Sequence, residues 1–115
     1  MSFKRTICGV ELTFAANMKE WRDLVMERAN HNCELHTGPA QDAHHLIKRA
    51  DARLKMCVEN GFAMTHQTHM RSHFDAKFDF AGEMEHRAKK RFADWEMLKQ
   101  LRRQMDREQI RSRDL

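Results

Sequence analysis

The sequence predicts a small α+β domain in which an N-terminal helix and a long C-terminal helix flank a central block of short strands. Apolar residues recur at helical spacing over residues 18–29 and again over 83–110. Between them, short runs are separated by turn signals at Thr37-Gly38-Pro39 and Asn60-Gly61. A chain of 115 residues is near the usual domain size, so we expect a single domain over residues 1–115.

Composition narrows the class of protein. Charged residues make up 33% of the chain, the formal net charge is +4 and the pI is about 9.2. This mild basicity favours a polyanionic partner without establishing one. Three cysteines without framework spacing predict a reduced, cytoplasmic protein. No segment resembles a signal peptide or a bilayer-spanning helix, so we expect no membrane partner.

The N-terminal third begins with a segment that is predicted only coarsely. Residues 1–16 are consistent with either a short hairpin or an extended arm. Asn17 then has the character of a helix N-cap, and Glu20 stands three residues later, as in a capping box. We therefore predict a helix over 18–29.

The central block is predicted as strand–turn–strand–loop–strand–helix. Thr65 is expected to cap the helix that carries the downstream histidines. In chain order, the predicted segments are a strand at Cys33–Leu35, a strand at Asp42–Ile47, a loop or helical turn at 50–59, a tight turn at Asn60-Gly61, a strand at 62–64 and a helix from 66.

The C-terminal helix, at about 83–110, has an apolar stripe and a basic face. We expect the stripe to pack into the core, and a dimer or partner interface is the alternative. The basic face is either a solvated surface or a surface that contacts phosphates. The stripe comprises Met84, Ala88, Phe92, Trp95, Leu98, Leu101 and Met105, and the basic face comprises Lys89, Lys90, Arg91, Lys99, Arg102 and Arg103.

Five of the eight histidines lie within one stretch of thirty residues. In a helix, His69 and His73 are four residues apart and project from one face, so both can bind one ion. In a strand, His44 and His45 point to opposite sides. If His44 faces the helix, it completes a three-histidine site and leaves His45 beside it as an unligated base. Asp42 lies on the same strand face as His44, where it either accepts a hydrogen bond from a ligand imidazole or is a solvated carboxylate.

These motifs resemble those of HNH endonucleases. The matching elements are Asp42-Ala-His44-His45, then Asn60, then His69-x-x-x-His73. The spacing resembles that of family members with an all-histidine metal site. The amino-acid sequence of the central stretch is similar to that of small phage-encoded HNH endonucleases. The resemblance covers about residues 30–75 and implies a ββα-metal (His-Me finger) core.

The resemblance also implies a function: metal-dependent hydrolysis of DNA phosphodiester bonds, by nicking or cleavage, with low intrinsic sequence specificity. His45 would be the general base, and Asn60 would hold its loop in register. One divalent ion (Mn, Ni, Zn or Mg) would be held by His44, His69 and His73. The cations expected to contact the DNA backbone are Lys48, Arg49, Arg53 and Arg71.

Several expectations stay open. Many HNH proteins carry a structural zinc on two Cys-x-x-Cys pairs, whereas this chain has only Cys33-x-x-His36, with Thr65 and Thr68 at the second pair. We therefore expect no such zinc. The alternative function is a non-catalytic, zinc-stabilised DNA-binding or adaptor module, with His66 or Cys57 as a fourth ligand. A small RNase is a third reading. Expected partners are DNA and phage packaging or recombination proteins, and the protein would be a monomer or homodimer.

Overall fold

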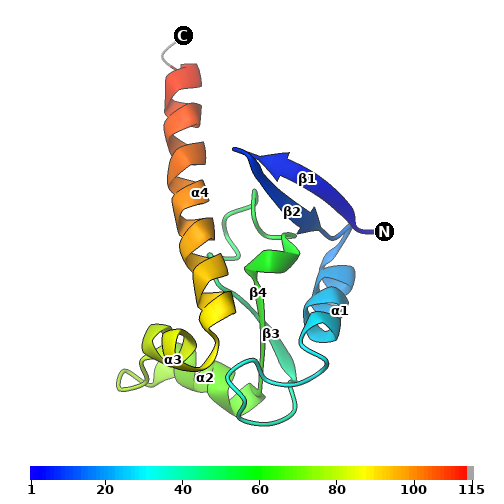
Figure 1. Ribbon diagram of the computed structural model, residues 1–115, viewed down its shortest axis with the longest axis vertical. Helices are drawn as coiled ribbons and strands as arrows, with labels where there is room; N and C mark the ends of the chain where they lie inside the picture. The colour runs from blue at the N-terminus through cyan, green and yellow to red at the C-terminus, as the bar shows by residue number, and fades with distance from the viewer. Residues whose placement is uncertain (114–115) are drawn as a thin grey trace.

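The computed structural model describes the backbone of residues 1–113 and the side chains of residues 1–109, and it shows an α+β fold (Figure 1). Over this range the fold contains two small antiparallel sheets and four α-helices. The elements are β1 Phe3–Ile7, β2 Val10–Phe14, α1 Met18–Arg28, β3 Asp42–His45, a 3₁₀ turn η1 Val58–Asn60, β4 Gly61–Met64, α2 His66–Phe74, α3 Phe80–Arg87 and α4 Lys89–Arg113. No helix among the described residues has the length and apolar character needed to cross a membrane.

The first sheet is a hairpin, which confirms one of the two readings of residues 1–16. Its strands β1 and β2 pair in the register Phe3↔Phe14 to Ile7↔Val10. The two connecting residues, Cys8 and Gly9, have φ values of 49° and 80°. Two successive positive φ values suit the right-handed twist of a two-residue hairpin.

The predicted N-terminal helix is confirmed as α1, which ends one residue earlier than expected. The Asn17 side chain accepts a hydrogen bond from the Glu20 amide at 2.9 Å. The Glu20 carboxylate in turn accepts one from the Ala16 amide at 3.0 Å. The helix therefore begins where its polar capping residues satisfy otherwise unpaired N–H groups.

The second sheet joins β3 and β4, and α2 follows β4 directly. The strands pair from Asp42↔Met64 to His45↔Gly61. The predicted Thr65 cap is confirmed, because its hydroxyl accepts from the Thr68 amide at 3.1 Å. Figure 1 shows α1 along one side of this hairpin and α2 at its end.

One predicted strand of the central block is wrong. Cys33–Leu35 forms no strand, because the chain turns there and the Cys33 amide donates to the Gly38 carbonyl at 2.8 Å. The tight turn predicted at Asn60-Gly61 is the end of η1, where the Asn60 amide donates to the Cys57 carbonyl at 3.1 Å and the Gly61 amide donates to the Val58 carbonyl. Gly61 then begins β4 with a φ of −95°.

The predicted helix over 83–110 is interrupted. α3 ends at Arg87, Ala88 is non-helical with φ −138° and ψ 58°, and α4 starts at Lys89. Met84 of α3 and the α4 residues Phe92 and Trp95 pack in the cluster of Phe62, and further along α4 Leu98 packs with Leu12. The continuous apolar period therefore predicts which residues are buried but not the non-helical backbone at Ala88.

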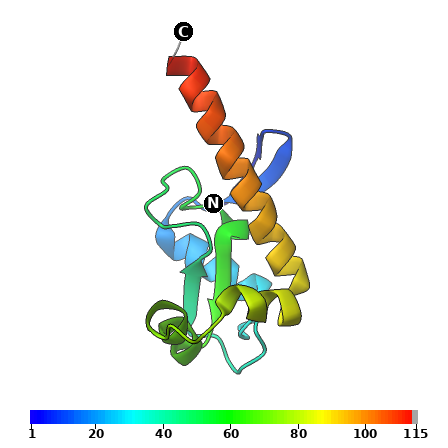
Figure 2. The same cartoon turned by 90° about the vertical axis from the view of Figure 1, so that its left-hand side faces the viewer.

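The apolar stripe of the C-terminal segment is core, as predicted. Figures 1 and 2 both show α4 beside the β1–β2 hairpin. Packing between these elements forms one buried cluster, and α1 and β4 contribute to a second. The first cluster contains Leu12, Phe14, Ile47, Leu54, Cys57, Leu98 and Leu101.

Candidate metal centre and histidine site

Three histidines from two elements, β3 and α2, meet beside the β3–β4 hairpin. His44 comes from β3, and His69 and His73 come from α2. One ring nitrogen from each lies within 4.8 Å of the others. The Nε2 atoms of His69 and His73 are 3.1 Å apart. This is the group of side chains that the sequence predicted as metal ligands, and the structure brings all three together.

The local structure explains why these rings converge. In β3, alternation sends His44 toward α2 and His45 to the opposite side, as predicted. In α2, the four-residue spacing places His69 and His73 on the face turned toward His44. Phe80 packs edge-on against the His44 ring at 5.5 Å between ring centroids, so aromatic packing restrains that ligand.

Asp42 orients one of the three ligands. Its Oδ2 atom is 2.8 Å from His69 Nδ1 and also 2.8 Å from His66 Nδ1. Burial disfavours the charged carboxylate, but the hydrogen bonds from His69 and His66 outweigh it and lower the pKa of Asp42. An ionised carboxylate can only accept, so His69 Nδ1 carries the proton and His69 Nε2 presents a lone pair to the cluster.

Burial and charge keep His44 neutral. Burial of the ring, followed by the proximity of His69, His73 and His45, lowers the pKa of His44 to about 3. A neutral imidazole has the lone pair that a metal ligand needs. The donor set therefore suits one divalent transition metal, because neutral nitrogen ligands are preferred by Zn²⁺, Ni²⁺ and related ions.

His45 lies on the other face of β3 in a different environment. Its ring stacks on Trp21, and its Nε2 atom is 3.0 Å from the Lys55 carbonyl oxygen. A carbonyl only accepts, so Nε2 carries the proton and Nδ1 has a free lone pair. Burial, with smaller contributions from Arg49 and Lys55, lowers the pKa of His45, although the hydrogen bond to the Lys55 carbonyl opposes this shift.

Asn60 links the loop after β3 to the start of β4. The side chain is fully buried, with an exposed fraction of 0%. Its Oδ1 atom accepts from the Ile47 amide at 2.6 Å, and its Nδ2 atom donates to the Ile47 and Leu54 carbonyls, both at 3.1 Å. Since Ile47 follows His45 by two residues, these bonds restrain the backbone that carries His45.

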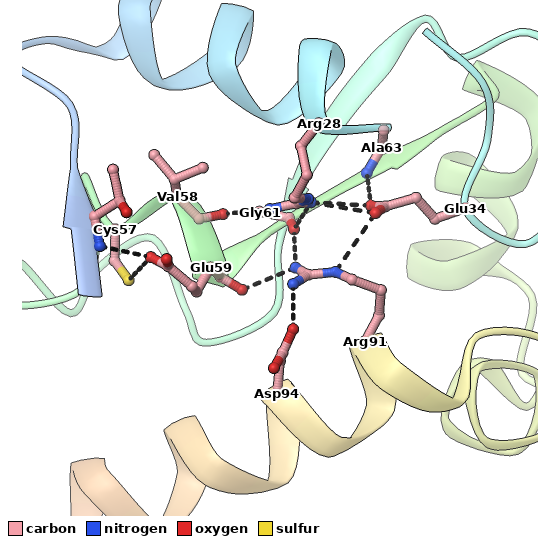
Figure 3. Close-up of polar contacts among 10 residues, drawn as sticks. Arg28, Glu34, Cys57, Val58, Glu59, Gly61, Ala63, Arg91 and Asp94 are labelled. Carbon is pink, nitrogen blue, oxygen red and sulfur yellow. Dashed lines mark hydrogen bonds and ion pairs between the residues drawn. The ribbon is translucent and has the colours of Figure 1, made fainter. Parts of the chain in front are cut away.

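Two arginines from the flanking helices α1 and α4 donate hydrogen bonds to the backbone carbonyls of residues 58–61, on either side of Asn60 (Figure 3). The sequence did not predict these contacts. Arg28 of α1 donates to the Val58 and Gly61 carbonyls at 2.8 and 2.7 Å. Arg91 of α4 donates to the Glu59 carbonyl at 2.8 Å and to the Gly61 carbonyl. Arg91 was predicted to lie on an open basic face, but it is buried. The carbonyls on both sides of Asn60 are thus fixed.

Glu34 compensates the charge of this arginine pair. Its carboxylate is 3.1 Å from Arg28 and 3.5 Å from Arg91, and it accepts a hydrogen bond from the Ala63 amide at 2.8 Å. Asp94 adds an ion pair to Arg91 at 2.7 Å. Burial lowers the pKa of Arg91. Asp94 lies three residues after Arg91 on α4, a helical neighbour, whereas Glu34 lies outside both helices, so helical periodicity gave no signal for its contacts with Arg28 and Arg91.

The four predicted DNA-contacting cations differ in their surroundings. Lys48 and Arg49 are exposed and line a cleft of about 1120 Å³ that also contains His44, His45, His69 and His73. Arg53 is held by Asp51 at 2.9 Å and Asp106 at 2.8 Å. Arg71 pairs with Asp75 at 3.6 Å and lies over the Phe78 ring. The structure therefore places only Lys48 and Arg49 in the cleft with the histidines.

The α1 helix also contributes cations to that cleft, which sequence reasoning missed. Lys19 and Arg22 line it opposite α2. Lys19 pairs with Asp23 at 3.2 Å, and Arg22 donates to the Gln41 carbonyl at 2.9 Å. Helical periodicity places both on the polar face of α1, but it does not say which element that face meets.

The half-site Cys33-x-x-His36 forms no metal cluster with other described residues. Cys33 is buried, as expected, and its sulfur accepts a hydrogen bond from the Thr37 hydroxyl at 3.1 Å. The Thr37 and Thr68 hydroxyls are 3.2 Å apart, and Thr65 donates to Thr68 at 2.8 Å. Hydroxyl hydrogen bonds thus connect the positions at which the resemblance would put zinc ligands.

Neither candidate for a fourth metal ligand joins the three histidines. His66 is held by Asp42, and its ring nitrogens are outside the cluster formed among the described side chains. Cys57 packs in the cluster between the hairpin and α4. Burial raises the pKa of the Cys57 thiol to about 12, so it is protonated and a poor ligand. The ligand set is consequently open on one side, where His73 is exposed.

Comparison with known proteins adds no relative: no protein-family model, curated protein or solved structure matches this chain. The class of site is therefore defined by its own chemistry. It combines a cluster of three histidines, a carboxylate that orients one of them, and a separate neutral imidazole in the same cleft.

Proposed function

We propose that this protein is a metal-dependent HNH endonuclease whose β3, β4 and α2 elements form a ββα-metal core. The observation that carries the proposal is the division of histidine roles across β3. His44 joins a three-imidazole cluster, while His45 lies outside that cluster in the same cleft, with one nitrogen bonded to a carbonyl and the other free. A closed structural metal site would need no such fourth histidine.

The proposed reaction is hydrolysis of a phosphodiester bond in DNA. His45 Nδ1 takes a proton from the attacking water, because Nε2 already carries the ring proton and donates a hydrogen bond to the Lys55 carbonyl. Asn60 holds the backbone of this segment, so the position of the base is set by buried hydrogen bonds. Asp42 keeps His69 in the tautomer that leaves Nε2 available as a ligand.

The metal would be held by His44, His69 and His73. When bound, a divalent ion supplies an electrophile that offsets the negative charge developing on the phosphate and the leaving oxygen. All three ligands are nitrogens, which favours Mn²⁺, Ni²⁺ or Zn²⁺ over Mg²⁺.

The charges of the cleft support a polyanionic substrate. Lys48 and Arg49 are exposed beside the histidines, and the protein is basic overall with a net charge of +4. Such cations attract a polyanionic backbone without reading its bases. We therefore propose DNA contact mainly through phosphates, with low sequence specificity, and we leave Arg53 out because Asp51 and Asp106 engage it.

The test is cleavage of supercoiled plasmid by metal-stripped protein to which Mg²⁺, Mn²⁺, Ni²⁺ or Zn²⁺ is added separately. We expect nicking that His45→Ala abolishes while calorimetry shows that the variant still binds metal. His86→Ala is the matched control, since His86 is exposed on α3 and outside the cleft. Tight zinc binding without hydrolysis by any metal form would instead support the zinc-stabilised DNA-binding module. Cleavage of RNA alone would point to an RNase.

A further inference from the structure

Trp21 of α1 lies flat against the proposed base. The ring centroids of Trp21 and His45 are 4.0 Å apart, and the ring planes differ by 4°. Trp21 has an exposed fraction of 1%, so its indole is fixed within the core. The apolar spacing of the helix predicted over 18–29 indicates only that Trp21 faces the core. Its contact with the base is visible only in the tertiary structure.

One short loop segment fixes both rings. Trp21 Nε1 donates to the Cys57 carbonyl at 2.8 Å, and His45 Nε2 donates to the Lys55 carbonyl at 3.0 Å. The carbonyls are two residues apart. The backbone of 55–57 therefore sets the position of the indole edge and of the imidazole edge together.

Gly61 makes the close approach of Trp21 feasible. In the β3–β4 register, Gly61 is directly opposite His45. A Cβ atom at Gly61 would lie 3.0 Å from Trp21 Cζ2 and would overlap Val25 Cγ2. Because Gly61 has no side chain, α1 can pack closely on β4, and Trp21 can reach the His45 ring.

The stack supplies a restraint that the hydrogen bond lacks. The terminal χ2 torsion of histidine is broad, because it joins sp³ and sp² atoms. A bond from Nε2 to the Lys55 carbonyl fixes one edge, but the ring can still rotate about the line from Cβ to that edge, and this rotation swings Nδ1. A flat surface against the ring face opposes such rotation, since it would push the imidazole into the indole.

We propose that Trp21 is a positioning residue for His45, holding the plane of the imidazole so that Nδ1 faces the cleft. The role rests on the proposed nuclease function. Trp21 acts through His45 and is not a member of the three-histidine cluster. A second helix, outside the β3–β4–α2 unit, then contributes to catalysis.

The test compares Trp21→Phe with Trp21→Met. Both variants lose the Nε1 hydrogen bond and part of the indole volume, but only phenylalanine keeps a flat ring. We expect the kcat for plasmid nicking to be at least tenfold lower in Trp21→Met than in Trp21→Phe, with the same KM and metal affinity. Equal kcat values in two folded variants would overturn the proposal, because a merely structural role predicts equal losses.

A spectroscopic readout is independent of cleavage and of the methionine variant. Ring currents from a stacked indole shift the His45 Cε1–H and Cδ2–H resonances upfield, and a His45→Ala spectrum assigns them. We expect that shift in the wild-type protein and a smaller one in Trp21→Phe. Unshifted resonances in the wild-type protein would overturn the proposal even if Trp21→Met failed to fold. If wild-type protein cleaved nothing, the proposed function would fail, and the NMR shifts alone would then decide whether Trp21 orients the ring.

Discussion

Replacing Gly61 with alanine tests how closely α1 packs on β4. The backbone φ of Gly61 is −95°, which alanine adopts without strain, so the folded state is destabilised by steric overlap alone. The new Cβ would overlap Val25 Cγ2 and lie 3.0 Å from Trp21 Cζ2. Val25 is buried, with an exposed fraction of 0%. The methyl group therefore cannot be accommodated unless α1 moves away from the strand.

The magnitude follows from two opposing effects. Overpacking of a close-packed core costs about 1–3 kcal/mol. Alanine also reduces the conformational entropy of the unfolded chain relative to glycine, which stabilises the folded state by about 0.4–1 kcal/mol. We expect Gly61→Ala to lower the free energy of unfolding by about 1–2 kcal/mol. Val25→Ala alone removes two buried methyl groups and should cost about 2–3 kcal/mol, including the cavity it leaves.

The double variant distinguishes steric overlap from any other cause. Val25→Ala removes the γ carbons that the new methyl group would meet, so the added Cβ partly fills the vacated space. We expect the double variant to be about 1–2 kcal/mol more stable than the sum of the single effects predicts. Urea unfolding of the four proteins, with midpoint and slope fitted, measures this coupling. Additivity within about 0.5 kcal/mol would refute the packing described for α1 and β4.

Three further variants test the polar contacts. Asn60→Ala should cost about 3–5 kcal/mol in urea unfolding, because the Ile47 amide and carbonyl lose their side-chain partner inside the core. Asp42→Ala should weaken Zn²⁺ binding about 10–100-fold in calorimetry, since His69 loses its orienting partner. Asp51→Asn should cost about 1–3 kcal/mol at pH 7. The hydrogen bond from Arg53, opposed by burial, lowers the pKa of Asp51 in the folded state. Its contribution is therefore complete above the unfolded-state value of about 3.9 and is lost as pH falls through the folded-state value.

One control variant serves all three measurements. Asp23→Ala, at an exposed pair with Lys19, should leave both stability and zinc affinity nearly unchanged. Unaltered zinc affinity in Asp42→Ala would show that the carboxylate does not orient His69. For Asp51→Asn, the difference in unfolding midpoint from wild type should shrink between pH 7 and pH 3. A difference that stays constant over this interval would contradict the assignment to the Asp51 ion pairs.

Local signals in the sequence were sufficient for the elements that depend on short-range chemistry. Asn17 with Glu20, and Thr65 before α2, are capping residues whose partners lie within four positions. The shared side of His69 and His73, and the opposite sides of His44 and His45, were also predictable from the helical repeat and strand alternation. That His44 faces the helix was only a condition of the predicted cluster. The main failures were different. The strand at Cys33–Leu35 and the unbroken helix over 83–110 were inferred from short apolar runs and a continuous period, which packing overrides.

By itself, the sequence determined which residues have the chemistry for a metal site and on which faces of their own elements they lie, since both follow from residue type and backbone period. The tertiary structure alone decided which faces meet. It placed Trp21 on His45, buried Arg91 against the carbonyls flanking Asn60, and paired Arg53 with Asp106 of α4. These contacts join residues from separate elements, and their geometry depends on how closely helices and strands pack. No local pattern encodes that distance.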